Sequence, residues 1–261
     1  MTTDERVRSV FVCPHCGTDF ETVGRSVRCS QGHTFDRARE GHLNLLIAGR
    51  LSSGTVPGDT AESLNARRRF LSTGAYEPIS DAVNATLGEI DGPALDVGCG
   101  EGWYLSRIRS SRRFGLDISK RGVQMASRSM PDAEFVVGNA HRLPVRDGSC
   151  DAVFNVFAPH SIAEFQRVLA PGGRWTTVTP GPDHLHQMRP RRNDHILERE
   201  RRREAPPDHA QSAERLRFDL ELSAEQARDL FSMTPLVWQT AADAAPSTSV
   251  TVDVWVSSGR T

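Results

Sequence analysis

Lysine is almost absent from this chain of 261 residues, because Lys120 is the only one and every other basic residue is arginine. Arginine suits phosphate contacts, although codon use in a GC-rich genome would explain the bias equally well. Long apolar runs are also missing: none approaches the roughly 20 residues that a membrane helix needs. The opening MTTDERVRSV lacks an apolar signal-peptide core. We therefore expect no membrane association, a cytoplasmic protein and reduced cysteines.

Charge of one sign is lacking too, since the formal net charge is −1. No overall positive field attracts nucleic acid, so composition neither demands nor excludes such a partner. The densest basic stretch is the arginine-rich segment 188–209. Two interpretations stay open for it: an arm that contacts RNA, or a solvated mixed-charge surface.

The few cysteines gather near the start, in CPHCGTDFETVGRSVRCSQGH at residues 13–33. The spacing C-x2-C-x12-C-x3-H is typical of a closed tetrahedral zinc site, with ETVGRSVR as a hairpin that turns near Gly24. So small a fragment buries too little apolar surface to fold alone, and a metal ion would supply the missing stability. The alternatives are redox-active or adventitious cysteines, or a catalytic metal. The predicted zinc ligands are Cys13, Cys16, Cys29 and His33.

From residue 92 onward, strand and helix patterns alternate, which predicts a doubly wound α/β fold with a mostly parallel sheet. A buried strand at 94–97 leads into the turn DVGCGEG at 96–102. This turn is G-x-G-x-G and not the G-x-G-x-x-G of dinucleotide binders. The tail adds an amphipathic helix within 222–236 and an alternating strand at 249–257, which we expect to close the sheet as an edge strand.

Polar residues follow the ends of the next strands along the chain. Asp117 ends the second strand, Asn139 and Ala140 follow the third, and Asn155 lies at the end of the fourth. Ligands of such sheets bind beyond the carboxyl ends of the strands. There Asp117 can accept hydrogen bonds from ribose hydroxyls, and Asn139 and Ala140 can contact an adenine edge. An NAD- or FAD-dependent oxidoreductase and a domain without cofactor are the alternatives.

The D-x-G-x-G-x-G turn, the acid after the second strand and the run RVLAPGG together resemble the class I S-adenosylmethionine-dependent methyltransferases, over residues 91–180. With the ribbon in front, the whole chain resembles the 23S ribosomal RNA (guanine-N1)-methyltransferases, including macrolide-resistance members. The segments that carry this resemblance are CPHC to HTFDRAREGHLNLL (13–46), PGD and ARRRFLSTGAYEPI (57–79), LDVGCGEGWY (95–104) and FGLDISK (114–120). NAHRLP, NVFAP, TPGPDHL and MTPLVW extend it to residue 238.

The resemblance implies a seven-stranded, mostly parallel class I methyltransferase sheet behind a small zinc ribbon. It divides the chain into an RNA-recognising ribbon (1–37), a linker and helical segment (38–90) and a methyltransferase domain (91–261). Its implied cofactors are S-adenosylmethionine and one structural zinc ion. Its implied partners are 23S rRNA and a second copy of the chain. A methyltransferase for small molecules and a non-catalytic zinc-ribbon RNA-binding protein are the competing interpretations.

The resemblance also implies roles for single residues. Two residues outside the strand ends, Tyr76 and His184, would close over the cofactor, although Tyr76 is equally well explained as a core aromatic. Asn155, His160 and His184 would contact the guanine, whose N1 proton must leave during the reaction. The remaining cofactor residues are Asp96, Gly98, Gly100, Glu101, Gly102, Asp117, Asn139 and Ala140.

Overall fold

The computed structural model describes residues 9–47, 60–189, 205–234, 236 and 246–261. The chain forms two compact units. The first consists of Met1–Gly58, Glu89–Trp175 and Arg260–Thr261, and the second of Asp59–Gly88 and Thr176–Gly259. The arginine-rich segment 188–209 lies for its greater part, at 190–204, outside the described residues. No helix in the described ranges is long and apolar enough to cross a membrane.

The ribbon at the start of the first unit is an antiparallel sheet of three short strands. These are β1 (Phe20–Val23), β2 (Ser26–Cys29) and β3 (Thr34–Asp36). Strands β1 and β2 form the predicted hairpin, with Val23 opposite Ser26 and Gly24 at a φ of +62° in the turn. Among the strand residues only Val27 and Cys29 are buried. So small a core fits the expectation that a metal ion supplies part of the stability of the ribbon.

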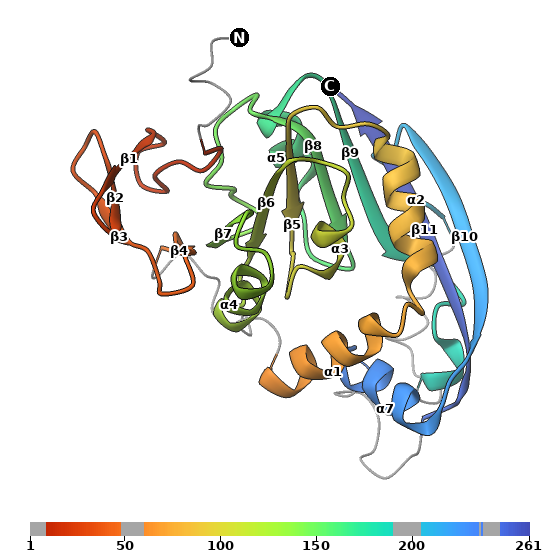
Figure 1. Cartoon of the computed structure of the whole chain (residues 1–261). Helices are drawn as coiled ribbons and strands as arrows, with labels where there is room; N and C mark the ends of the chain where they lie inside the picture. The colour runs from red at the N-terminus through yellow and green to blue at the C-terminus, as the bar shows by residue number, and fades with distance from the viewer. Residues whose placement is uncertain (1–8, 48–59, 190–204, 235, 237–245) are drawn as a thin grey trace. The chain divides into compact units, whose positions relative to one another are not determined.

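The main sheet of the first unit has parallel strands whose side chains are mostly buried on both faces. Its strands run in the order β9-β8-β5-β6-β7-β4 (Figure 1). The bounds are β4 (Leu43–Asn44), β5 (Pro93–Val97), β6 (Arg112–Asp117), β7 (Glu134–Val137), β8 (Cys150–Val156) and β9 (Leu169–Pro180).

Three helices alternate with these strands. They are α3 (Trp103–Ser106), α4 (Lys120–Ser129) and α5 (Ile162–Val168). Ser119 caps α4 by accepting a hydrogen bond from the N–H of Gly122, and the helix buries Val123 and Ala126 toward β6 and β7. The parallel pairings of β5 with β6 and β8, and of β6 with β7, place their carboxyl ends at one edge. This confirms the predicted doubly wound sheet.

The second unit begins with a helix pair and ends with an antiparallel strand pair. The last residues of strand β9, 176–180, also belong to the second unit. Arg69 of α1 donates two hydrogen bonds to Asp229 of α7, at 2.9 and 2.5 Å, where the two helices pack. The elements are α1 (Ala61–Ser72), α2 (Glu77–Leu87), the 3-10 turn η1 (His186–Met188), β10 (Ser212–Glu221), α7 (Ala224–Ser232) and β11 (Ser249–Arg260).

The prediction that residues 249–257 form a closing edge strand was wrong. Strand β11 lies between β9 and β10, and β10 forms the edge. Apolar and polar residues alternate along β11, but neither face of the strand is exposed to solvent there. Residues 250–254 are all buried, and Asp253 is fully enclosed. Strand β10 escaped notice because arginines and acids separate its half-buried Leu216, Phe218 and Leu220. The seven expected strands are β5 to β11, and β4 is an additional strand from the segment after the ribbon.

Candidate functional site

The four predicted zinc ligands meet at one point of the ribbon. The donor atoms of Cys13, Cys16, Cys29 and His33 all lie within 4.8 Å of one another. The Cys16 and Cys29 sulfurs are 3.6 Å apart, and His33 Nδ1 lies 3.6 Å from Cys13 Sγ and 3.3 Å from Cys29 Sγ. Bonds of about 2.3 Å to sulfur and 2.0 Å to nitrogen imply tetrahedron edges of about 3.5–3.8 Å. The donor set therefore fits a closed Cys3His zinc site.

The thiols of this cluster differ in their ionisation. Burial raises the pKa of the Cys13 thiol to about 11, whereas hydrogen bonds from Thr18 lower the pKa of Cys16 to about 7. A divalent cation deprotonates a coordinating thiol outright. A bound zinc ion would thus remove this difference by holding each sulfur as a thiolate, while leaving no coordination position open for catalysis.

The glycine turn after β5 lies against the loop that follows β8. Gly98 has a φ of +85°, and a Cβ placed on it would approach the Cβ of Ala158 to 2.3 Å. Glycine is required here both by the left-handed backbone and by the close approach of the second loop. At Gly102, a Cβ would meet Met130 Cε at 2.6 Å. The turn thus brings bare backbone to the carboxyl edge of the sheet.

Asp117 is oriented by the backbone around it. Its two carboxylate oxygens accept hydrogen bonds from the N–H groups of Gly100 at 2.8 Å and Ser119 at 2.7 Å. The acid at the end of β6 is therefore fixed against the glycine turn that ends β5. The fixed orientation of this carboxylate, an acceptor of hydrogen bonds, fits the predicted contact with a ribose.

Three carboxyl groups, of Asp96, Glu101 and Asp117, influence one another at this edge. Burial raises the pKa of Asp96 well above its usual range, and the charges of Asp117 and Glu101 raise it further. Asp96 and Glu101 are only 2% and 7% exposed. A positively charged ligand nearby would favour the ionised carboxylates. The edge therefore fits S-adenosylmethionine, which carries a sulfonium and an ammonium group, better than an uncharged ligand.

Asn139 and Ala140 form a half-buried turn directly after β7. The Asn139 side-chain carbonyl accepts a hydrogen bond from the N–H of His141 at 2.9 Å, which fixes the amide plane. The backbone N–H of Gly138 donates to the carbonyl of Asp117 at 2.9 Å. The turn therefore lies beside the acid of β6, where the sequence places the adenine of the cofactor.

Asn155 lies fully buried near the end of β8. Its amide nitrogen donates a 2.5 Å hydrogen bond to the carbonyl of Val97, at the start of the glycine turn. Its amide oxygen, Oδ1, is buried and accepts no hydrogen bond from any described residue. An unsatisfied buried acceptor is costly, and this one points to a donor that a ligand would supply.

The loop after β8 carries a signal that sequence reasoning missed. Phe157 has a φ of +57°, rare for a residue with a bulky side chain, and its side chain is 38% exposed. Strained backbone of this kind concentrates at functional sites.

In the same loop His160 donates from Nδ1 to the carbonyl of Ala158 at 3.1 Å, since a carbonyl only accepts. The imidazole stacks on Phe165, with centroids 5.6 Å apart.

Two predicted site residues belong to the second unit. Tyr76, 2% exposed, precedes α2 and meets the ring of Phe70 edge-on at 5.1 Å. His184 is 9% exposed, and its Nδ1 accepts a hydrogen bond from the backbone N–H of Asp253 at 3.3 Å. The other predicted cofactor residues lie in the first unit. There the structure brings Asp96, Gly98, Gly100, Glu101, Gly102, Asp117, Asn139, Ala140, Asn155 and His160 to the carboxyl edge of the sheet and its loops.

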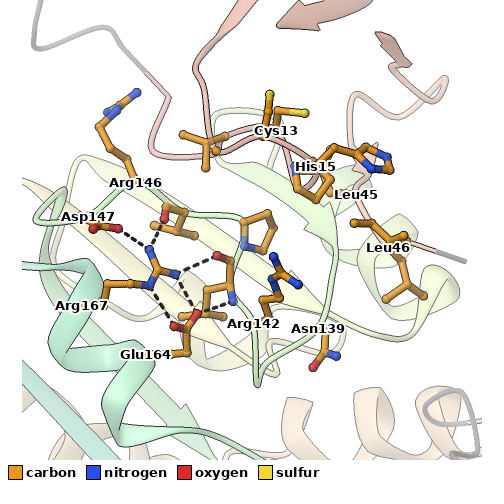
Figure 2. Close-up of a pocket in the computed structure, with 18 residues that line it drawn as sticks. Cys13, His15, Leu45, Leu46, Asn139, Arg142, Arg146, Asp147, Glu164 and Arg167 are labelled. Carbon is orange, nitrogen blue, oxygen red and sulfur yellow. Dashed lines mark hydrogen bonds and ion pairs between the residues drawn. The ribbon is translucent and has the colours of Figure 1, made fainter. Parts of the chain in front are cut away.

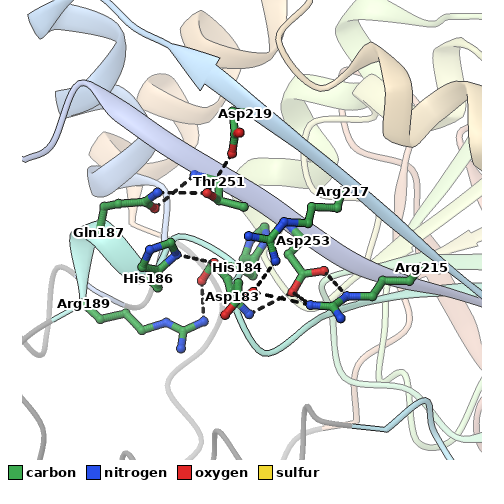
Figure 3. A network of polar contacts seen from close by, with 10 residues as sticks. All are labelled: Asp183, His184, His186, Gln187, Arg189, Arg215, Arg217, Asp219, Thr251 and Asp253. Carbon is green, nitrogen blue, oxygen red and sulfur yellow. Dashed lines mark hydrogen bonds and ion pairs between the residues drawn. The ribbon is translucent and has the colours of Figure 1, made fainter.

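A polar network holds the segment around His184 to β10 and β11 (Figure 3). Arg215 donates two hydrogen bonds to Asp253, at 2.7 and 2.9 Å, and Asp253 also accepts from the N–H of Asp183 at 2.8 Å. Burial raises the pKa of Asp253, but the hydrogen bonds and the arginine charges outweigh it, so the pKa lies below its ordinary value. Asp253 is thus a buried carboxylate that orients the turn from 181 to 184.

Comparison with known proteins matches both parts of the first unit. The family described as "RlmA, N-terminal" matches residues 11–50, and the family described as "Methyltransferase domain" matches residues 95–176. A solved structure of similar fold is the YcgJ protein of Bacillus subtilis. It is 16% identical with a TM-score of 0.49, over 71% of this chain and 98% of that one.

Curated relatives extend over nearly the whole chain. A Streptomyces fradiae protein named 23S rRNA (guanine(748)-N(1))-methyltransferase is 34% identical over 87% of this chain and 85% of its own length. A Bacillus subtilis (strain 168) protein, YxjB, named as a candidate 23S rRNA (guanine-N(1)-)-methyltransferase, is 31% identical over 94% of this chain and 95% of its own.

Proposed function

The chain belongs to the 23S rRNA (guanine-N1)-methyltransferase family, and we propose that it transfers a methyl group from S-adenosylmethionine to N1 of a guanine in 23S rRNA. The observation that supports this most is the conjunction of an intact Cys3His ribbon with an intact acidic cofactor edge in one chain. A small-molecule methyltransferase would need the second feature but gives no role to the first.

The cofactor would be held by the turn after β5 and by the acids beside it. The close approach of Gly98 to the loop after β8 keeps side chains out of this space, and Asp117 is already oriented for ribose hydroxyls. Burial and the neighbouring acids raise the pKa of Asp96, and a bound cation beside it and Glu101 would oppose that shift by favouring the carboxylate form. When bound, S-adenosylmethionine supplies a methyl group that its positively charged sulfur activates. We expect positioning of the base to account for most of the rate.

The guanine must lose its N1 proton, and the two candidate histidines differ in what they offer. His160 donates through Nδ1, so in the neutral ring Nε2 carries the lone pair. His184 accepts through Nδ1, so its Nε2 carries the hydrogen. His160 is therefore in the tautomer of a general base, whereas His184 is in that of a hydrogen-bond donor. We propose that His160 Nε2 accepts the proton that guanine N1 loses.

Asn155 complements this assignment from the end of β8. An amide cannot act as a base, but Oδ1 would accept a hydrogen bond from a guanine N–H once a movement of the covering residues exposes this enclosed atom. Its amide nitrogen is committed to Val97, so the orientation of the oxygen is fixed. N1 lies on the pairing edge, so the base must be extruded or presented from a loop before these contacts form.

The activity is tested with labelled S-adenosylmethionine and unmodified 23S rRNA, followed by primer extension across the product. N1-methylguanine blocks pairing, so we expect a cofactor-dependent stop at one guanine. Label without a stop would mean another methylated atom. If neither RNA nor ribosomal subunits become labelled, we would propose a small-molecule substrate instead. Macrolide resistance stays a prediction, tested by growth of a macrolide-sensitive host that expresses the chain.

The assignment of the base has its own test. We expect His160→Ala to lower kcat about 100-fold with unchanged S-adenosylmethionine affinity. Its rate should then rise about tenfold per pH unit, as solvent deprotonation of guanine replaces the imidazole. His184→Ala is the matched variant and should lack this added alkaline slope. Equal pH profiles for the two variants would contradict the assignment.

A further inference from the structure

A pocket of about 590 Å³ opens between the metal-binding turn of the ribbon and the segment after β7 (Figure 2). Its walls come from residues 12–17 and 45–47 on one side and 142–147 on the other. Two backbone hydrogen bonds fasten these walls, from Val12 N–H to the Pro144 carbonyl and from Arg146 N–H to the Val10 carbonyl, both 2.9 Å. The volume lies in the range of small-molecule sites, and the fastening shows that the pocket is built into the unit.

Two of the three arginines that line the pocket are already committed. Arg167 donates to both carboxylate oxygens of Glu164, at 2.9 and 2.7 Å, and to Asp147 at 2.6 Å. The carbonyls of residues 143 and 145 accept its remaining hydrogens. Arg146 pairs with Asp19 and donates to the carbonyl of Ser9 at 3.0 Å. Neither guanidinium offers a net charge to a ligand.

Arg142 differs from both. Its side chain is exposed, and no carboxylate of the described residues forms an ion pair with it. Its guanidinium points into the space between the two walls (Figure 2). An unneutralised arginine at the mouth of a pocket fits a phosphate, which its planar fork can bind through two hydrogen bonds.

The other residues that line the pocket suit an RNA nucleobase better than a free anion. Pro14, Leu46 and Pro144 present apolar surface, and Asn139 adds an amide at the rim. RNA-binding proteins read single-stranded loops by placing unstacked bases against such surfaces and by fixing the backbone through arginine. Asn139 also belongs to the turn that the sequence places beside the cofactor adenine. The pocket therefore adjoins the side of the cofactor edge where the adenine is expected.

We infer that this pocket binds one unpaired nucleotide of the RNA substrate, with its nucleobase against the wall of Pro14, Leu46 and Pro144 and its phosphate on Arg142. The inference rests on the proposed function, because it takes RNA as the substrate. It also gives the ribbon a specific role: the metal-binding turn forms one wall of a nucleotide site, so that zinc fixes the shape of that wall.

The test measures binding of a 23S rRNA hairpin fragment by Arg142→Ala at several salt concentrations. Removal of one phosphate contact should weaken binding about tenfold and lower the slope of log K against log salt by about 0.7. Arg109→Ala is the matched control, because Arg109 is also exposed in the first unit; it should change neither quantity. Affinity for S-adenosylmethionine should be unchanged in both variants.

A second pair of variants tests the space itself. Leu46→Trp should fill the half-buried wall and raise the KM for RNA several-fold, whereas Leu46→Ala leaves the space open and should have a smaller effect. Zinc content and thermal unfolding verify that each variant is folded. A loss of S-adenosylmethionine affinity in Arg142→Ala would show that the pocket holds the cofactor and would overturn the inference. Equal RNA binding by Arg142→Ala and Arg109→Ala would also overturn it.

The failure of the inference and that of the proposed function can be told apart. If the wild-type chain methylates no RNA, the proposed function fails. If the wild-type chain methylates RNA but the two variants of each pair behave alike, the proposed function stands and only the nucleotide pocket is refuted.

Discussion

The ribbon and the cofactor edge of the sheet both gather polar groups around a point, but they do so by opposite means. In the ribbon, four side chains converge from the end of β2 and from the segments around the strands, and little apolar surface is buried by the strands. At the sheet edge, strand β5 is buried along its whole length, and backbone groups and fixed carboxylates form the site. We therefore expect the ribbon to need its metal ion in order to fold, and the cofactor edge to be folded before its ligand binds.

This difference indicates where each region is vulnerable. A site held together by metal ligands tolerates changes in its open turns but not the loss of a ligand. A site formed by close-packed backbone tolerates no added volume, because its neighbours cannot withdraw. Three changes, taken from the largest expected effect to the smallest, test this contrast.

Removal of zinc should separate the two regions most clearly. Structural zinc contributes on the order of 10 kcal/mol of binding free energy to small metal domains. We therefore expect Cys29→Ser, or a chelator, to abolish amide-exchange protection in residues 20–36. Protection in β5 and β8, and affinity for S-adenosylmethionine, should persist. Ser30→Ala, a neighbouring exposed position, is the control. Loss of protection in β5 as well would show that the sheet depends on the ribbon.

An added methyl group should destabilise the two regions to different extents. At Gly98 it would lie 2.3 Å from Ala158 in a left-handed backbone, so Gly98→Ala should lower the free energy of unfolding by about 3 kcal/mol. At Gly24, also left-handed, nothing lies within 4 Å. Gly24→Ala should therefore cost only about 1 kcal/mol, for the backbone alone. Urea unfolding of the zinc-loaded protein compares them, and equal losses would contradict the packing argument.

The ion pair that joins the two regions should matter least. Arg146 and Asp19 are 31% and 35% exposed, so solvent screens their attraction. Arg146→Ala should cost at most about 1 kcal/mol and speed zinc release to a chelator by no more than about fivefold. Arg109→Ala serves as the exposed control. A much larger acceleration would mean that the sheet, and not the metal alone, keeps the ribbon folded.

The contrast also explains which parts of the molecule could be predicted. The zinc ligands were visible because all four lie within residues 13–33, where spacing alone restricts the geometry. The parallel sheet and its acidic edge were visible because polar residues lie at or near the ends of β6, β7 and β8, namely Asp117, Asn139 and Asn155. The edge strand was assigned wrongly, since β11 and β10 both alternate and only their pairing decides which one faces solvent.

By itself, the sequence determined the two kinds of site, because short spacings and strand patterns are local properties of the chain. The tertiary structure decided which partners orient the individual side chains. Asn155 is fixed by a carbonyl 58 residues earlier in the chain, and the backbone that sets the tautomer of His184 is 69 residues away. Arg142 forms no ion pair with the described residues, and the two acids that line the same pocket, Asp147 and Glu164, accept hydrogen bonds from Arg167. Such partners are chosen by packing in three dimensions, and no local pattern in the chain specifies them.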